Sequence, residues 1–158
     1  MAKEKSKWKV ESEIKDKEKY IQEIEKKANG QNVKTFIPEQ WTLEYELAAN
    51  GLGEEMLQTI ATMLAEKIQD KEKNEEKKAE LLEKYTKEYN EYKSKEAKAS
   101  YVYSFFSHKI VSKAEFAQKF SFDLENIFKG KTVEEIVTVL PNYLVKAIEY
   151  VTTNIEGI

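Results

Sequence analysis

Apolar residues recur three and four positions apart through most of the chain beyond residue 52, where they are set among lysines and glutamates. This spacing aligns side chains along one stripe of an α-helix. Segment 53–70 shows it most clearly, with Met56, Leu57, Ile60, Met63, Leu64 and Ile68 on one face. The pattern predicts a chain built mainly from helices, with one or two strands at most.

A second helix is predicted over residues 71–99, which are rich in Lys and Glu. Its apolar stripe is spaced like a coiled-coil seam and consists of Leu82, Tyr85, Tyr89 and Tyr92. Residues 54–99 together predict a long helical hairpin. The tyrosine stripe favours helix packing over a base-stacking platform. In a helical interaction protein the same stripe would bind a partner helix or self-associate.

Helix-start signals organise the last third of the chain. Ser112 with Glu115, and Thr132 with Glu135, match the capping box that begins many helices. Pro141 suits the first position of a terminal helix. The inward faces of these helices are predicted to carry Phe116, Phe120, Leu124 and Ile127, followed by Tyr143, Leu144, Ala147, Ile148 and Val151.

One stretch departs from the helical pattern. Residues 17–29 predict a helix that stops at Gly30, and "NVKTFI" then alternates like a short strand over 33–37 that ends at Pro38. "SYVYSFFSHKIV", residues 100–111, is the second candidate strand. The predicted fold is therefore α-rich α+β in a single domain. An αβ unit spans 17–52, a helical insertion 53–100, and a strand with helices 101–158.

Two carboxylates follow the predicted strand in "WTLEYELA". Glu44 and Glu46 would share a face if the chain were extended there, and paired carboxylates bind hard divalent cations. A helix is predicted over 42–52 with Thr42 as its N-cap. In a helix the two side chains would point about 200° apart around the axis. Both carboxylates would then interact favourably with the positive N-terminal end of the helix dipole. Both interpretations stay open at this stage.

Lys113 lies one position into a predicted helix, where its charge opposes the helix dipole. It is either a solvated surface lysine or a lysine held to face an anion. Other chemistries have little support, because the chain has no Cys, no Gly-rich phosphate loop and a single histidine, His108, set among aromatic residues. All 26 basic residues are lysine and the net charge is −3, so DNA contacts would be salt-sensitive backbone contacts.

The ordered set "VKTFI", "WTLEYELA", "SKAEFAQKF" and "LPNYLVKAIEYV" resembles the C-terminal part of the OLD (overcoming-lysogenization-defect) family of ATP-dependent endonucleases. These proteins, like the Gabija-type anti-phage nucleases, join an ABC-type ATPase to a Toprim nuclease domain. The resemblance covers residues 17–155. It implies that Glu44 and Glu46 are ligands of Mg²⁺ or Mn²⁺, and that Lys113 is the catalytic lysine that faces the scissile phosphate.

Other family motifs are missing from these 158 residues. There is no "EGxxE"-like turn, no "DxD" and no Walker A motif, so no ATP site is expected in this chain. The resemblance implies a fragment that begins after the "DxD" strand and is inactive alone. Its expected partners are DNA and a chain that carries the rest of the Toprim and ATPase protein. A homodimer is also allowed. A cytoplasmic location is expected, because no secretory signal and no apolar membrane span are seen.

Two further interpretations belong to other classes. The chain could be a small helical interaction protein that binds a partner through its tyrosine-striped helix. It could also be a regulator that binds nucleic acid through lysines, which its acidic balance disfavours. The segment 33–37 separates these interpretations. Its burial inside a sheet, together with convergence of Glu44, Glu46 and Lys113, would favour the nuclease interpretation. A closed helical bundle with these three residues scattered over its surface would favour the first alternative.

Overall fold

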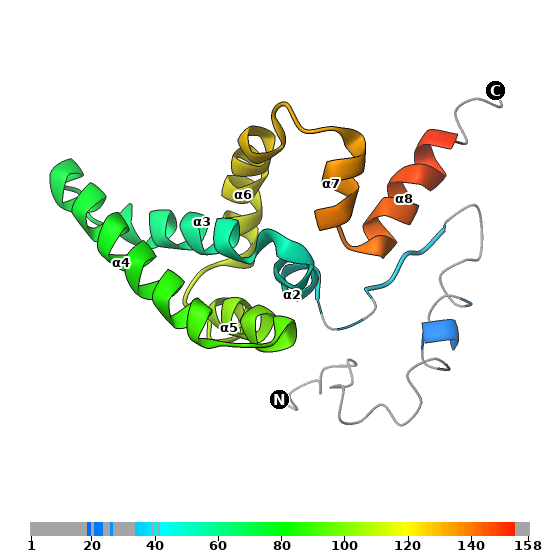
Figure 1. Ribbon diagram of the computed structural model, residues 1–158, viewed down its shortest axis with the longest axis horizontal. Helices are drawn as coiled ribbons and strands as arrows, with labels where there is room; N and C mark the ends of the chain where they lie inside the picture. Colours follow the sequence, from blue (N-terminus) through cyan, green and yellow to red (C-terminus); the bar gives the residue numbers. More distant parts are fainter. Residues whose placement is uncertain are drawn as a thin grey trace, which may run out of the picture. The chain divides into compact units, whose positions relative to one another are not determined.

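The computed structural model describes residues 19, 21–23, 26, 34–38, 40 and 42–153 (Figure 1). The chain divides into two compact units. Unit 1 comprises Met1–Trp41 and Tyr143–Ile158, and unit 2 comprises Thr42–Asn142. The predicted section boundary after residue 52 coincides with a helix start, whereas the one after residue 100 falls inside a helix.

The described part of the chain is helical, as the apolar spacing predicts. Thr42 caps the first short helix, so the helix start predicted at residue 42 is confirmed. The elements in chain order are α2 (Leu43–Leu47), the π-helical turn η2 (Ala48–Leu52), α3 (Gly53–Ala65), α4 (Lys71–Glu91), α5 (Lys95–Ser107), α6 (Lys113–Phe128), α7 (Val133–Val139) and α8 (Asn142–Thr153).

Helix α3 supplies the centre of the unit 2 core. Met56, Leu57 and Ile60 on its predicted apolar face are completely buried, and Leu52 and Val102 join them from η2 and α5. Burial of each such side chain contributes about 1.5–3 kcal/mol. Helices α4, α5 and α6 all pack against α3 (Figure 1). The α3–α4 pair is the predicted hairpin.

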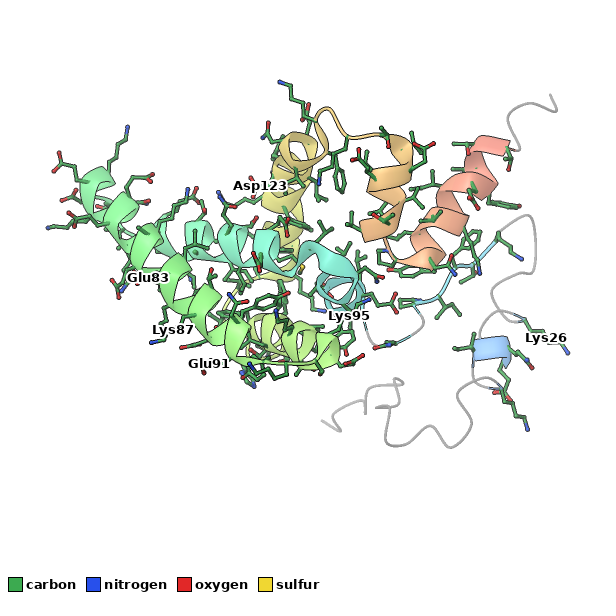
Figure 2. The ribbon with its side chains drawn as sticks, viewed as in Figure 1. Lys26, Glu83, Lys87, Glu91, Lys95 and Asp123 are labelled. Atoms are coloured by element: carbon green, nitrogen blue, oxygen red, sulfur yellow. The ribbon has the colours of Figure 1, made fainter. Side chains whose placement is uncertain are left out.

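The single helix predicted over 71–99 is wrong, because the chain breaks after Glu91. Ser94 begins α5, and its hydroxyl accepts a hydrogen bond from the backbone N–H of Ala97 at 3.1 Å. The break folds α5 back onto the tyrosine stripe of α4. The ring centroids of Tyr85 and Phe105 lie 4.8 Å apart, and both rings are buried. The outer side of α4 is charged and exposed, with Glu83, Lys87 and Glu91 in a row (Figure 2).

The strand predicted over 100–111 is also wrong, because α5 is helical through Ser107. Its buried residues are Ala99, Val102, Phe105 and Phe106, whose spacing follows the helical period. No strand occurs in the described ranges, and residues 34–38 have no regular structure. Val33, Gly30 and most of the helix predicted over 17–29 lie outside the described residues, although residues 19, 21–23 and 26 are helical.

Local capping signals predicted the later helices well. Ser112 caps α6, and Thr132 and Glu135 form a complete capping box at α7. Phe116 and Phe120 are buried as predicted. The face predicted for α8 is only partly right, because Ile148 and Val151 are 51% and 57% exposed. Within unit 1, the rings of Phe36 and Tyr150 lie 5.8 Å apart.

A glycine makes the bend between α2 and α3. Gly51 has φ 115° inside η2, a backbone conformation that residues with a side chain rarely adopt. Val139 of α7 lies beside it. The Asn50 side-chain amide donates to the backbone carbonyl of Glu46 at 2.7 Å, which closes the end of α2. Gly51 therefore sets the direction of α2 relative to α3.

We expect Gly51→Ala to destabilise the chain by about 1–3 kcal/mol, because a Cβ strains the backbone at this φ. Gly130→Ala is the control, since Gly130 has φ 79° with nothing within 4 Å of an added Cβ. We expect Gly130→Ala to lower the free energy of unfolding by about 1–2 kcal/mol. Urea unfolding measures both changes. A Gly51→Ala chain as stable as the unmodified one would contradict this account.

Candidate functional site

The first turn of α2 holds one of the predicted acidic residues. Thr42 is extended, with φ −141° and ψ 165°, and its hydroxyl accepts a hydrogen bond from the N–H of Tyr45. This N-cap places Glu44 two positions into the helix. A carboxylate there interacts favourably with the positive end of the helix dipole. The alternative interpretation of Glu44, as a first-turn carboxylate of a helix, therefore matches its local structure.

The start of α6 holds the predicted lysine. Ser112 is the N-cap and accepts a hydrogen bond from the N–H of Glu115, so Lys113 is the first residue of the helix. A positive charge at this position opposes the helix dipole. A nearby negative charge offsets that cost.

Glu44 provides this negative charge. Lys113 Nζ donates a hydrogen bond to Glu44 Oε2 at 2.9 Å, although the two residues are 69 positions apart in sequence. The Glu44 side chain is 16% exposed and that of Lys113 is 46% exposed. The ammonium also lies 5.3 Å from the ring centroid of Tyr103, which comes from α5. Three elements of unit 2 therefore meet around one lysine.

The surroundings of Glu44 favour its charged form. Partial burial raises the pKa of this carboxyl, but hydrogen bonds with Lys113, with Thr42 and with its own backbone, and the charge of Lys113, outweigh burial. The pKa of Glu44 is lower than usual as a result. At neutral pH Glu44 is therefore an ionised carboxylate, and the Lys113 ammonium lies beside it.

Glu46 is not part of this pair. It is 5% exposed and lies in the same short helix as Glu44. Two positions along a helix place side chains about 200° apart around the axis. The extended geometry that would put both carboxylates on one face is not present, and the ion pair joins Lys113 to Glu44.

Glu44 by itself fits a divalent cation in one respect. Its ionised carboxylate accepts a hydrogen bond from the Lys113 ammonium, which shows that a cation can approach Oε2. Mg²⁺ is commonly held by one or two carboxylates together with phosphate oxygens and waters. Within the described ranges no group of three or more His, Cys, Asp or Glu side chains is placed to hold a metal. Among the described residues, Glu44 would therefore supply a single carboxylate to a divalent cation.

Other polar groups of unit 2 serve the packing of helices. The Thr59 hydroxyl donates to Asp123, which links α3 to α6; Figure 2 labels Asp123 on α6. The Tyr101 hydroxyl donates to Glu88 at 2.7 Å, which links α5 to α4, and burial and this carboxylate raise the pKa of Tyr101. His108, at the C-terminal end of α5, is exposed.

Sequence reasoning missed Tyr103 at this site. The pattern in residues 100–111 predicts a strand at this position, whereas the contact of Tyr103 with Lys113 depends on α5 being a helix. Its ring also meets Tyr45 of α2 edge-on, with centroids 6.4 Å apart. An aromatic residue three positions before the buried Phe106 is the only local signal that could have indicated this arrangement.

No family model matches this chain, and neither a curated protein nor a solved structure does. No helix within the described ranges is long and apolar enough to cross a membrane.

We expect the Glu44–Lys113 pair to stabilise the fold measurably. A double-mutant cycle with Glu44→Gln and Lys113→Met should give a coupling energy of about 0.5–1 kcal/mol, the upper part of the range for exposed pairs. Lys119 and Glu66 form a matched control pair between α6 and the end of α3, with both side chains more exposed than Glu44. Their cycle should give less. Equal coupling in both cycles would contradict a special environment for Glu44.

We also expect the contribution of Glu44 to depend on pH. Its pKa is lower in the folded chain, so its stabilising effect is complete above the unfolded value of about 4.3 and is lost as pH falls through the folded value. The difference in unfolding free energy between the unmodified chain and Glu44→Gln should therefore shrink below about pH 4. Urea unfolding at pH 7 and in acid measures it. A difference that stays constant with pH would exclude this explanation.

Proposed function

We propose that this chain is the C-terminal part of an OLD-like Toprim nuclease and contributes Glu44 and Lys113 to a DNA-cleaving site that other segments complete. One observation carries the proposal. The resemblance assigns roles to two residues in separate motifs, "TLEYE" and "SKAEFA", and Lys113 Nζ lies 2.9 Å from Glu44 Oε2. Spacing alone would not have paired them across 69 positions.

The segment between the two motifs supports the same assignment. Helices α3, α4 and α5 fill residues 53–107 and form a packed helical unit. The family resemblance predicts a helical insertion between the late acidic motif and the lysine helix. Helices α3 to α5 separate Glu44 from Lys113 in sequence, and the chain then returns so that the two residues lie side by side. An insertion between the two motifs would have this organisation.

Glu44 and Lys113 would have complementary roles in such a site. Paired divalent cations stabilise the attacking and leaving oxygens of an in-line displacement at phosphorus. Glu44 would supply an ionised oxygen ligand to Mg²⁺ or Mn²⁺. Lys113 would neutralise charge on the DNA phosphate as a point charge. Glu46 belongs to the proposal by resemblance alone, because it is buried in α2 and the ion pair joins Lys113 to Glu44.

The rest of the site would come from elsewhere. These 158 residues contain no "EGxxE"-like turn, no "DxD" and no ATP-binding motif. We therefore propose that the missing Toprim and ATPase segments, on the same protein or on a partner chain, complete the site in the cytoplasm. The isolated chain should not cut DNA, and cleavage by it with Mg²⁺ or Mn²⁺ would refute the incomplete-site argument.

A second candidate, a helical interaction protein, has one observation in its favour. Phe122 of α6 and Val133 and Val137 of α7 are 64%, 71% and 40% exposed. Apolar side chains of this size at the surface suit contact with another chain. The tyrosine stripe does not add support, because Tyr85 and Tyr89 are buried inside unit 2. The nuclease proposal also allows contact with another chain, because the missing segments can belong to a partner chain.

We expect the isolated chain to bind Mn²⁺ and Mg²⁺ weakly through Glu44. Isothermal titration calorimetry should show binding by the unmodified chain and its loss in Glu44→Ala/Glu46→Ala. Glu44→Ala and Glu46→Ala, measured singly, show how much each residue contributes to the loss of binding. Glu44→Ala should account for most of the loss, because Glu46 is buried. Glu75→Ala/Glu76→Ala on α4 is the matched control, since both glutamates are exposed. Binding that survives in Glu44→Ala/Glu46→Ala would reject the proposed metal role.

A further inference from the structure

We propose that Tyr103 is a positioning residue for Lys113. Its ring holds the ammonium of this lysine in place beside Glu44, so that the positive charge is fixed where the proposed function needs it. The observation behind this inference is that Lys113 Nζ lies 5.3 Å from the centroid of the Tyr103 ring. The inference rests on the proposed function and adds a residue of the helical insertion to the candidate site.

Lys113 needs a second contact to be held in one place. A lysine carries a compact charge at the end of a flexible four-carbon chain, and ordering that chain costs side-chain entropy. The side chain is 46% exposed, and an ion pair of such exposure contributes little against that entropy. The face of an aromatic ring attracts an ammonium within about 6 Å of its centroid through the ring quadrupole. The Tyr103 ring therefore adds a restraint that the carboxylate of Glu44 does not provide by itself.

The Tyr103 ring is itself held in place. It is half-buried on α5, and Val102 and Phe106 of the same helix are buried in the core of unit 2. Its edge-on contact with the Tyr45 ring has an interplanar angle of 82°, a geometry that aromatic pairs favour. Tyr45 is buried and directly follows Glu44 in α2. The ring is therefore packed against the segment that carries the carboxylate, while the ammonium from α6 lies over it.

Another lysine–tyrosine contact of unit 2 provides an internal control. Lys98 of α5 lies 4.5 Å from the ring centroid of Tyr89, which is buried on α4. Both contacts involve α5, but they use different rings and different neighbouring helices. A substitution of Tyr103 that acts through its own ring contact should therefore affect Lys113 and leave Lys98 unchanged. A substitution that loosens α5 as a whole should affect both lysines.

The test is nuclear magnetic resonance of the full chain with ¹³C-labelled lysine, compared with Tyr103→Leu and Tyr103→Phe. Protons above an aromatic ring resonate upfield, so the Cε methylene signal of Lys113 should lie upfield of those of solvated lysines. Lys113→Met identifies this signal by removing it. Tyr103→Leu should abolish most of the displacement, whereas Tyr103→Phe should retain it because phenylalanine keeps the ring face. The Lys98 signal should stay displaced in both variants.

A second readout measures the positioning directly. The ¹³C relaxation of the Lys113 Cε group reports picosecond-to-nanosecond motion at the end of the side chain. Tyr103→Leu should increase this motion, while the relaxation of Lys98 should not change. Glu44→Gln should weaken the upfield displacement of Lys113 without abolishing it, because the ring contact does not require the carboxylate. Thermal unfolding verifies that each variant is folded.

The outcomes separate this inference from the proposed function. Loss of the displacement and greater motion of Lys113 in Tyr103→Leu, with recovery in Tyr103→Phe, support the positioning role. An undisplaced Lys113 signal in the unmodified chain, an unchanged signal in Tyr103→Leu, or equal changes at Lys98 and Lys113 overturn it. Complete loss of the displacement in Glu44→Gln also overturns it, because the ion pair would then hold the ammonium alone.

The proposed function is tested by the Mn²⁺ titration and by the DNA cleavage assay, and neither of them alters Tyr103. Failure of the proposed function in those assays would leave the ring contact intact and would overturn only its role in DNA cleavage.

Discussion

The burial of α3 is the constraint on which the rest of unit 2 depends. Met56, Leu57 and Ile60 are inaccessible to solvent, and α4, α5 and α6 all pack around this helix. Several side chains, each contributing about 1.5–3 kcal/mol on burial, fix these positions far more strongly than polar contacts can. The Thr59–Asp123 hydrogen bond then selects how α6 lies on α3.

The geometry of Glu44 and Lys113 follows from this packing. An exposed ion pair contributes at most about 1 kcal/mol, so it cannot by itself bring together segments 69 residues apart. The core brings α2 and α6 near each other, and the bend at Gly51 directs α2. The two charges then pair because they already lie close.

The sequence predicted the parts of the structure that local chemistry determines. Thr42, Ser112 and Thr132 were identified as helix starts because capping depends on neighbouring backbone N–H groups. The strand prediction failed for α5. The residues "SYVYSFF" alternate like a strand, but Phe105 follows the helical period. Packing of Phe105 against Tyr85 decides in favour of the helix. The pairing of Glu44 with Lys113 could not come from spacing, since only tertiary packing relates them.

Tyr103 links the helical insertion to the candidate site. Its ring meets Tyr45 of α2 at 6.4 Å and the Lys113 ammonium at 5.3 Å, although it belongs to α5. The segment between the two motifs therefore does more than separate them, because its last helix forms one side of the lysine's environment. Any change that shifts α5 on α3 would move this ring and alter the balance between the two contacts of Lys113. The insertion is thereby physically coupled to the lysine that the proposed chemistry requires.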